Sequence, residues 1–452
     1  MYYKIGMHIE ESKITAVLCT KNTIWESLSL ENFSNIFNAI ESVLTDLLNK
    51  SGVSPGRITY LNIAIDFSEL IKKGMLPCAK VGYLQLGTKT IDNILSEEDF
   101  DPEFKKLIVT SKVSEANNTN NIFSTLKYFQ ESGVEIVVIN TMLSLDNIEE
   151  KELIKKINNF CEGKFKVMTS EALTDLGLIK KGNTLLYNGL LIKGTEKFFA
   201  ELSDICNSLS LYCNKYCLTI NGTLISQNRA IILPVKTINS TAISWLVGIG
   251  SLEQIKNCLI IKKENSHIYI TSIRNGVPKS SPFSYIKGNL KLNLSHPDIL
   301  EISVTSGGIN SAVKEDVFNA LKRINLQDEF LPVILAGIEY EEFPELFYSS
   351  VVFPVNSIFE EIAGAYGAAS ALLEIESNKK LVYKDKKVKE VENLWRTLYS
   401  RAEQEGMDLE QEVYKYFKET PLRYLPKEIS LIQAVLYGHL KTCPSLFTNK
   451  SS

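Results

Sequence analysis

Residues 1–20 read MYYKIGMHIEESKITAVLCT, and this stretch decides the fold prediction. Apolar residues dominate YKIGMHI and KITAVLCT, and only a short polar segment separates them, so the pattern predicts a β-hairpin. A hairpin turn that binds phosphate needs glycine, because glycine adopts positive φ and lets the phosphate approach the backbone N–H groups. Here the turn carries Glu10 and Glu11 instead, which is the wrong chemistry for a phosphate.

Strands and helices alternate through most of the remaining chain, which predicts an α/β fold. A second hairpin is predicted at residues 258–274, where CLIIKK and HIYITSI flank a polar turn, as the first hairpin is predicted at residues 3–19. Two lobes that each open with a hairpin resemble the actin-like ATPase architecture, in which two ribonuclease-H-like lobes face a nucleotide cleft. We expect these lobes at residues 1–175 and 176–376, followed by a charged helical extension at 377–452.

The composition narrows the class of protein. The chain has 452 residues, 44% of them hydrophobic, which is enough to bury a core in several domains. Basic and acidic residues are interspersed at a net charge of -4, so we expect no nucleic-acid partner. No apolar run is long enough for a membrane span, and the N-terminus lacks signal-peptide features, so we expect a cytoplasmic protein that does not bind a membrane. The eight cysteines form no CxxC pair, as expected for reduced, buried thiols.

Several segments together resemble the hydantoinase A/oxoprolinase family along nearly the whole chain. They retain the order and spacing of the family's motifs, although each match is short. The segments are EALTDLGLIKKGNTLLYNGLL at 171–191, LTINGTLIS at 218–226, LPVKTINS at 233–240, PDILEISVTSGGINS at 297–311, IAGAYGAA at 362–369 and TPLRYLP at 420–426.

The resemblance implies an activity, cofactors and a partner. Members of the family use ATP, with Mg²⁺, to open cyclic amides such as hydantoins and 5-oxoproline, and they usually work with a second subunit. A second hydantoinase-type subunit or a second copy of the chain is therefore an expected partner. By motif match, the residues carried over are Gly6, Asn183, Asn221, Gly222, Thr223, Gly307, Gly308 and Gly337, and all of these except Asn183 are candidates for cofactor binding.

The sequence departs from the family at the loops that should touch nucleotide. In the first hairpin His8 stands for an aspartate and Glu10 and Glu11 for a glycine pair, while none of residues 262–269 agrees with the second hairpin motif. Carboxylates repel a triphosphate, and their Cβ atoms obstruct the close backbone approach. This favours a catalytically degenerate subunit, a pseudoenzyme that acts through a partner.

An active enzyme with an altered cleft is the alternative. It would hydrolyse a cyclic amide of the hydantoin or 5-oxoproline type without the usual nucleotide loops. His8 and His267 are the candidate metal ligands in that case, together with Glu10, Glu11 and Glu264, although charged turns are commonly just solvated.

Other candidate groups have plainer interpretations. Asp66 and Glu69 in IDFSEL would supply paired carboxylates for acid/base work, but acidic loops are usually solvated. Ser303 and Ser306, in SVTSGG, would offer a nucleophile or an anion site, but a tight turn is the more ordinary interpretation. Trp245 lies in an apolar helical segment, which is typical of a core residue.

Overall fold

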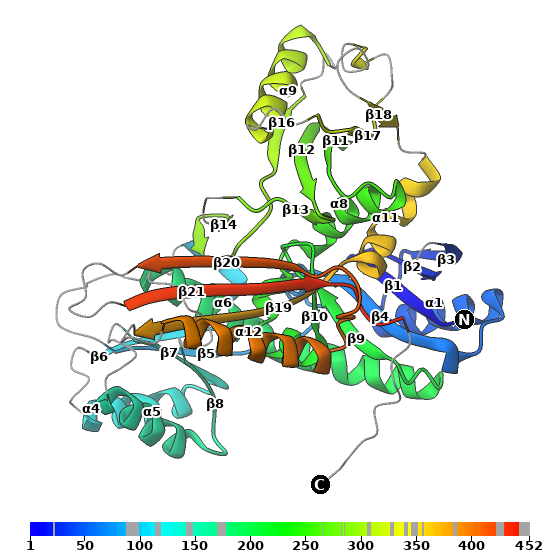
Figure 1. The fold of residues 1–452 in the computed structure, drawn as a ribbon. Helices are drawn as coiled ribbons and strands as arrows, with labels where there is room; N and C mark the ends of the chain where they lie inside the picture. Colours follow the sequence, from blue (N-terminus) through cyan, green and yellow to red (C-terminus); the bar gives the residue numbers. More distant parts are fainter. Residues whose placement is uncertain are drawn as a thin grey trace.

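The computed structural model shows a two-lobed α/β protein. It describes residues 1–20, 23–86, 99–113, 119–141, 148–169, 178–264, 266–281, 283, 285–304, 309–325, 330–338, 342–344, 351–354, 357–382, 387–421 and 429–442. One lobe stands above the rest of the molecule in Figure 1, and two helices, α8 and α11, lie between it and the lower sheet. Among the described residues, no helix has both the length and the apolar character needed to cross a membrane.

The largest sheet is built around the predicted first hairpin. β1 (Tyr3–Ile9) and β2 (Lys13–Cys19) pair antiparallel, with Ile9 opposite Ile14, so the hairpin prediction is confirmed. β3 (Ile24–Glu31) continues the antiparallel side, while β4 (Ile58–Ile65) and β9 (Asn214–Leu218) extend the sheet in parallel on the other side of β1. The order β3-β2-β1-β4-β9 is that of a ribonuclease-H-like lobe, and the described strands β10, β19, β21 and β20 extend it to nine.

Helix α1 (Ile36–Ser51) shows why the sequence folds this way locally. The Asn35 side chain accepts hydrogen bonds from the N–H groups of Phe37 and Asn38, and Gly52 ends the helix in the left-handed conformation at φ 64°. The apolar positions recur every three or four residues and bury one face of the helix against β2 and β3. Capping and periodicity agree, and they fix this helix on the sheet.

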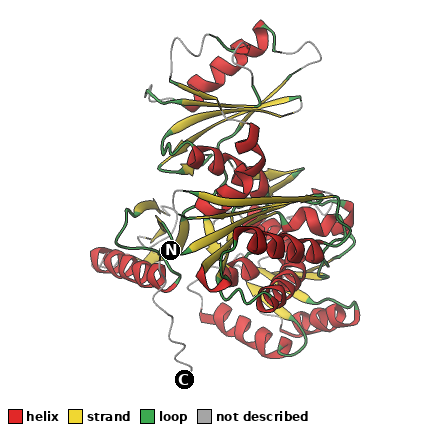
Figure 2. Cartoon of the chain, turned by 90° about the vertical axis from the view of Figure 1, so that its right-hand side faces the viewer, coloured by secondary structure: helices red, strands yellow, loops and turns green. Residues whose placement is uncertain are grey.

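The second hairpin opens the upper lobe. β11 (Cys258–Glu264) and β12 (His267–Arg274) pair antiparallel, and β17 (Val333–Ala336) and β18 (Val352–Pro354) follow in parallel beyond β11. β13 (Val277–Pro278) and β16 (Leu300–Ser303) pair with the outer side of β12. The strand order therefore repeats that of the first lobe. Figure 2 shows helices on both sides of this sheet. α9 (Ser311–Ile324) lies on the side that faces away from α8 and α11 in Figure 1.

A four-stranded parallel sheet of the described residues and several connecting helices complete the first half of the chain. The sheet has the order β6-β5-β7-β8, and α4 and α5 lie beside it in Figure 1. The elements are α2 (Phe67–Lys72), β5 (Val81–Leu86), α3 (Pro102–Lys105), β6 (Ile108–Val113), α4 (Thr119–Glu131), β7 (Ile136–Thr141), α5 (Ile148–Cys161) and β8 (Lys166–Thr169).

The chain returns to the first sheet after residue 175, where we placed the end of the first lobe. The long helix α6 (Leu178–Ser208) packs on β5 and β7, and β9 pairs with β4. The sheet of the first lobe is thus completed by residues from beyond that boundary. β10 (Leu224–Ser226) is a strand of this sheet, and α7 (Gln227–Ile232) follows it. β14 (Tyr285–Lys287) and β15 (Leu290–Leu292) pair with each other as a separate two-stranded sheet.

Helices α8 (Ser240–Leu252) and α11 (Ser357–Ser370) cross at very short distance. A Cβ on Gly248 would lie 1.8 Å from the Ala363 carbonyl oxygen, and one on Gly367 would lie 1.8 Å from the Ser244 carbonyl oxygen. A Cβ on Gly6 of β1 would lie 2.0 Å from the Ala365 carbonyl oxygen. Glycine at these positions lets α11 pack directly on α8 and on the first sheet.

The C-terminal region contains strands as well as the predicted helix. α12 (Lys387–Gln404) confirms the charged helix, but β20 (Tyr414–Pro421) and β21 (Ile429–Gly438) are strands, which corrects the expectation of an extension built of helix alone. β21 pairs with β19 (Leu373–Val382) over ten residue pairs, and β20 adds the outermost strand. β21 lies along the long edge of β19, and α12 packs on β19 and β21.

Candidate functional site

The turn of the first hairpin lies where the resemblance predicts a phosphate loop. The Glu10 N–H donates to the Lys13 carbonyl oxygen at 2.9 Å, so the hairpin itself uses this backbone donor. The Glu11 carboxylate lies 3.0 Å from the Lys73 ammonium, and half of each side chain is exposed. The turn therefore presents two carboxylates and no glycine.

His8 lies beside this turn with its side chain 12% exposed, and it packs against helices α8 and α11. One imidazole nitrogen, Nε2, lies 3.2 Å from the Thr241 carbonyl oxygen of α8 and 3.8 Å from Glu10. A Cβ on Gly364 of α11 would lie 2.7 Å from the ring, so the imidazole fills the space that this glycine leaves. Burial lowers the pKa of His8 below its ordinary value, although Glu10 acts in the opposite direction. The neutral ring can donate its proton to the Thr241 carbonyl.

The second hairpin and the loop after β17 are also internally bonded. The Gly337 N–H donates to Glu360 Oε1 of α11 at 2.7 Å. Gly337 has φ +63°, and a Cβ there would lie 2.4 Å from the Lys263 carbonyl oxygen, so the loop requires glycine for its own packing. His267 lies 3.3 Å from Glu301 on the neighbouring strand β16. Within the described part of the chain, no three His, Cys, Asp or Glu side chains gather as a metal site requires, and His8 and His267 belong to no such group.

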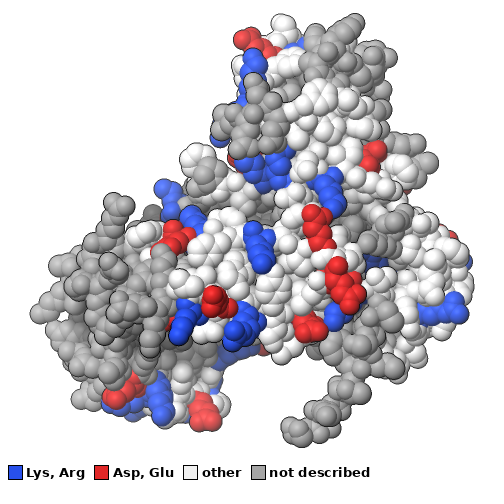
Figure 3. Space-filling model, viewed as in Figure 1, with Lys and Arg blue, Asp and Glu red and all other residues white. Residues whose placement is uncertain are grey.

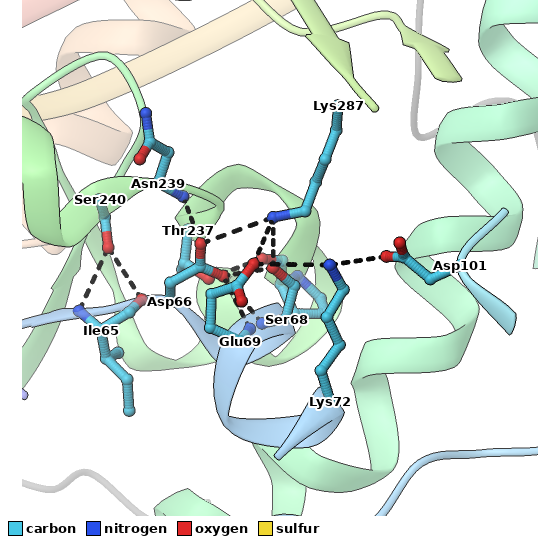
Figure 4. A network of polar contacts seen from close by, with 11 residues as sticks. Ile65, Asp66, Ser68, Glu69, Lys72, Asp101, Thr237, Asn239, Ser240 and Lys287 are labelled. Carbon is cyan, nitrogen blue, oxygen red and sulfur yellow. Dashed lines mark hydrogen bonds and ion pairs between the residues drawn. The ribbon is translucent and has the colours of Figure 1, made fainter. Parts of the chain in front are cut away.

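Asp66, at the carboxyl end of β4, is the centre of a polar network (Figure 4). One carboxylate oxygen, Oδ1, accepts from the Ser68 N–H at 2.9 Å, the Ser68 hydroxyl at 2.5 Å and the Glu69 N–H at 3.4 Å, which caps α2. The other, Oδ2, accepts from the Asn239 N–H at 2.7 Å, just before α8. The Asp66 carboxylate thus occupies backbone donors from two different segments.

The same network joins the first sheet to the connection between the lobes. Lys287 of β14 donates to the Ser68 hydroxyl at 2.9 Å and to Glu69 Oε1 at 3.0 Å. The Ser240 hydroxyl donates to the Ile65 carbonyl oxygen at 2.8 Å. Asp66 and Glu69, which the sequence suggested as an acid/base pair, are held as a helix cap and an ion-pair partner, as Figure 4 shows.

The other motif residues lie mostly in packed positions. Gly222 has φ +76° in the turn between β9 and β10, and a Cβ there would lie 2.8 Å from Pro278 and Val247. The buried Thr223 hydroxyl donates to Glu374 Oε2 at 2.6 Å. Asn183 Nδ2 donates to the Lys291 carbonyl oxygen at 3.2 Å. Gly307 and Gly308, like Ser306, lie outside the described residues.

Asn221 is different because it lines a cavity. The cavity has a volume of about 500 Å³ and lies on one face of strands β19, β21 and β20. Asn221 Oδ1 is buried and has no hydrogen-bond partner among the described residues. Neither His8, Glu10 nor Gly337 contributes to its wall.

A buried charge cluster in this wall was missed by the sequence analysis. Lys236 lies 3.1 Å from Glu374 and 2.5 Å from Glu376, and all three side chains are at most 15% exposed. Burial alone would raise the pKa of Glu376, but Lys236 and the neighbouring donors lower it to about 2. The alternation of Glu374, Glu376 and Asn378 along β19 is the signal in the sequence that one face of this strand is polar.

Two solved structures resemble the chain over nearly its whole length. One is a nucleotide-free structure of an acetone carboxylase from a study of ATP-dependent acetone carboxylation, at a TM-score of 0.66 and 10% identity. The other is the ATP-dependent caprolactamase from Pseudomonas jessenii, at a TM-score of 0.69 and 11% identity. Each alignment covers 97% of this chain and 88% of the other. This chain has the actin-like ATPase fold.

The predicted fold class is thereby confirmed, and the two structures have the fold that the resemblance to the hydantoinase A/oxoprolinase family implied. At these identities the likeness establishes the fold of the chain. No protein-family model matches the sequence, and no curated protein matches it either. The function must therefore be argued from the residues of this chain.

Proposed function

We propose that the protein is a catalytically inactive subunit of the hydantoinase/oxoprolinase type, which acts by binding a partner chain. Its fold is shared with two ATP-dependent enzymes over nearly the whole chain. The observation that carries the proposal is that the chain's own carboxylates occupy backbone donors at Gly337, a predicted cofactor residue, and at the carboxyl end of β4. Such a protein keeps the two-lobed architecture as a binding surface and has no use for the nucleotide.

Two carboxylates act in this way in different parts of the fold. Asp66 accepts from the backbone N–H groups of Ser68, Glu69 and Asn239, and Glu360 accepts from the Gly337 N–H. A phosphate would have to displace carboxylates that are already in place and carry the same charge. Two like charges 4 Å apart repel by about 4 kcal/mol at an effective dielectric constant of about 20.

The residues at the first hairpin also do not fit Mg²⁺ with ATP. Magnesium prefers carboxylate and water oxygens in an octahedral arrangement. His8 stands where the family has an aspartate, and its ring nitrogen Nε2 is directed at the Thr241 carbonyl oxygen. The half-exposed Glu10 and Glu11 lie at the turn itself, where the phosphates would have to approach. We therefore derive no reaction step through ATP.

Calorimetry tests the nucleotide part of the proposal. Wild-type protein titrated with ATP in the presence of magnesium is expected to give no binding heat. A variant with Glu10→Gly and Glu11→Gly serves as the comparison, because it removes both carboxylates and leaves the hairpin strands intact. Micromolar ATP binding by the wild type contradicts the proposal, since the internal carboxylates would then not block the nucleotide.

Binding of a partner is tested separately, by measuring the molar mass of the protein in solution. Light scattering after size-exclusion chromatography is applied to the chain alone and to the chain co-expressed with a second hydantoinase-type subunit. A stable complex with that subunit, or a dimer of the chain itself, is the expected result. A monomer in both samples refutes a role through a partner.

An enzyme with an altered cleft is the competing function, and the large polar cavity with its buried Lys236 is the observation in its favour. Purified chain incubated with hydantoin or 5-oxoproline, with and without ATP, distinguishes the two. If the wild type opens the ring and a Lys236→Met variant does not, the protein is an active hydrolase and the proposal of an inactive subunit is wrong.

A further inference from the structure

The nine-stranded sheet ends at β20, and this strand is exposed on both faces. Among the described strands only β21 pairs with β20, and residues 414–421 form no other backbone hydrogen bond within the described part of the chain. Six of its eight residues are exposed, including Tyr416 at 42% and Phe417 at 41%. Figure 1 shows β20 at the border of the lower sheet. Such an edge offers a row of N–H and C=O groups with which another strand can pair.

One face of β20 carries charges of both signs around an aromatic residue. Lys415 and Phe417 both lie against Trp395 of α12, with the ammonium 5.6 Å from the ring centroid and the two ring centroids 6.2 Å apart. Glu419 is on the same face, because side chains alternate along a strand. A cation and a carboxylate therefore flank Phe417, each two residues away. When the strand is reversed, the carboxylate takes the place of the cation, so this face is complementary to a second copy of itself.

Two β20 strands can pair antiparallel in only a few registers. Residues directly opposite each other must both direct their backbone groups toward the partner strand or both direct them away, so a two-fold axis passes beside a residue that lies opposite its own copy. With the axis at Phe417, Lys415 lies opposite Glu419 on both sides of the axis. On the other face, Tyr416 lies opposite Lys418. Opposite charges at directly opposed positions stabilise a strand pair.

The neighbouring registers lack these ion pairs. An axis at Lys415, Lys418 or Glu419 places a charge directly opposite the same charge, which destabilises a strand pair. An axis at Tyr416 places Lys415 opposite Phe417, so the cation gains no carboxylate. Charge complementarity therefore favours the register with the axis at Phe417.

The opposite edge of the sheet does not have this property. β3 carries Glu26 and Glu31 and no lysine or arginine, and Glu31 already lies 2.9 Å from Lys13. Two copies of β3 would therefore bring together only carboxylates. Pairing of β20 with β3 of another copy would join two different surfaces, which produces rings or open chains of molecules instead of a two-fold dimer.

We propose that two copies of this chain pair through β20, antiparallel about a two-fold axis at Phe417, so that their nine-stranded sheets become continuous. The pairing adds main-chain hydrogen bonds along the strand and forms two contacts between Lys415 and Glu419. This inference rests on the proposed function, because it identifies the partner as a second copy of the chain. One strand pair is a small interface, so the dimer is reversible.

Light scattering of the wild type over a range of concentrations measures the dimer. We expect the molar mass to rise from that of one chain to that of two, with a dissociation constant in the micromolar range. Lys415→Glu and Glu419→Lys each place like charges opposite one another twice, and each is expected to weaken the dimer about tenfold. The double variant, Lys415→Glu with Glu419→Lys, is expected to restore it. Thermal unfolding checks that each variant is folded.

The double variant separates the ion pairs from the packing of the single chain. Lys415 loses its contact with the α12 rings in both the single and the double variant, so only a pairing between opposite charges accounts for the restored dimer. Lys193→Glu is the matched control, because it makes the same change of charge on α6, outside the nine-stranded sheet. It is expected to leave the dimer unchanged.

Cysteine cross-linking with oxidised glutathione tests the register. In the proposed dimer residue 417 lies opposite its own copy, within the roughly 4.4–6.8 Å between Cα atoms that a disulfide spans, so Phe417→Cys is expected to form a covalent dimer. Residue 419 lies four positions from its own copy, roughly 13 Å along the strand. Glu419→Cys and the wild type are therefore expected to remain uncross-linked.

The proposal is overturned if the wild type remains a monomer at all concentrations, if the double variant dimerises no better than the single variants, or if Glu419→Cys cross-links as readily as Phe417→Cys. A monomeric wild type that binds a second hydantoinase-type subunit overturns the pairing of β20 and leaves the proposed function standing. ATP binding by the wild type, measured separately, refutes the inactive subunit and leaves the β20 dimer standing.

Discussion

Replacing Lys236 with Met removes a cation that contacts both buried glutamates, Glu374 and Glu376. The Lys236, Glu374 and Glu376 side chains are 15%, 3% and 14% exposed, so solvent cannot compensate for the lost charge. Leaving buried charge unpaired costs about 3–5 kcal/mol. The pKa of Glu376 gives a consistent value, because a fall from 4.5 to about 2 corresponds to about 3 kcal/mol. We expect Lys236→Met to lose about 3 kcal/mol of unfolding free energy at pH 7.

The loss of stability in this variant is expected to depend on pH. In the wild type the folded pKa of Glu376 is depressed, so its contribution is present above the unfolded pKa near 4.5 and is lost as pH falls toward about 2. In the variant, burial without Lys236 raises the pKa of Glu376, so its protonation in acid relieves part of the loss. Urea unfolding at pH 7 and at about pH 5 measures both effects.

An exposed ion pair supplies the control for this experiment. Lys193 contacts Glu135 with both side chains more than 40% exposed, and such pairs contribute about 0–1 kcal/mol. Lys193→Met should therefore lose little at either pH. If Lys236→Met loses no more than Lys193→Met, or if its loss does not shrink in acid, the buried cluster is not electrostatically coupled as described.

Three further predictions follow from the same geometry. Gly248→Ala should lower the free energy of unfolding by about 3 kcal/mol, measured by thermal unfolding, because the added Cβ would lie 1.8 Å from a backbone oxygen. Gly250→Ala on the same helix is the control and should be near neutral, because the nearest atom to its Cβ would be 3.7 Å away. Gly337→Ala should destabilise the upper lobe, because alanine is strained at a φ of +63° and its Cβ would lie 2.4 Å from the Lys263 carbonyl oxygen. Faster amide hydrogen exchange in β11 and β17 is the expected result, and unchanged exchange refutes the prediction. NMR titration should place the pKa of His8 below 6.5, and Glu10→Gln should lower it further, since Glu10 raises it; a rise instead contradicts the assigned contacts.

The hairpins were predictable because their information is local. Alternating apolar residues on both sides of a short polar turn specify β1 with β2 and β11 with β12, and no distant contact is needed to recognise them. The same holds for α12, whose apolar residues recur with helical periodicity. β20 was not recognised because most of its residues are exposed and it forms only against β21.

The cavity was not predictable because chain topology, and no local pattern, brings its residues together. Lys236 and Glu374 are 138 residues apart, and Lys236 and Glu376 are 140 apart. They meet because β10 pairs in parallel with β19 at Leu224 and Leu373, which places the segment after β10 beside β19. A single sequence gives no sign of that pairing. The role of a glycine was also not predictable from a motif. Gly6 matched a nucleotide motif, but in the structure its lack of a side chain allows the close contact between β1 and α11.

The charge distribution is consistent with the proposal that this protein keeps the fold but does not bind nucleotide. The face in Figure 3 shows acidic and basic side chains interspersed, with no large field of one sign. At the first hairpin turn, at Gly337 and at Asp66, the donors described above have partners within the chain, so a ligand there would have to break bonds that already exist. A donor that already has a partner offers a ligand no unmet hydrogen bond, so a ligand gains little free energy at these loops.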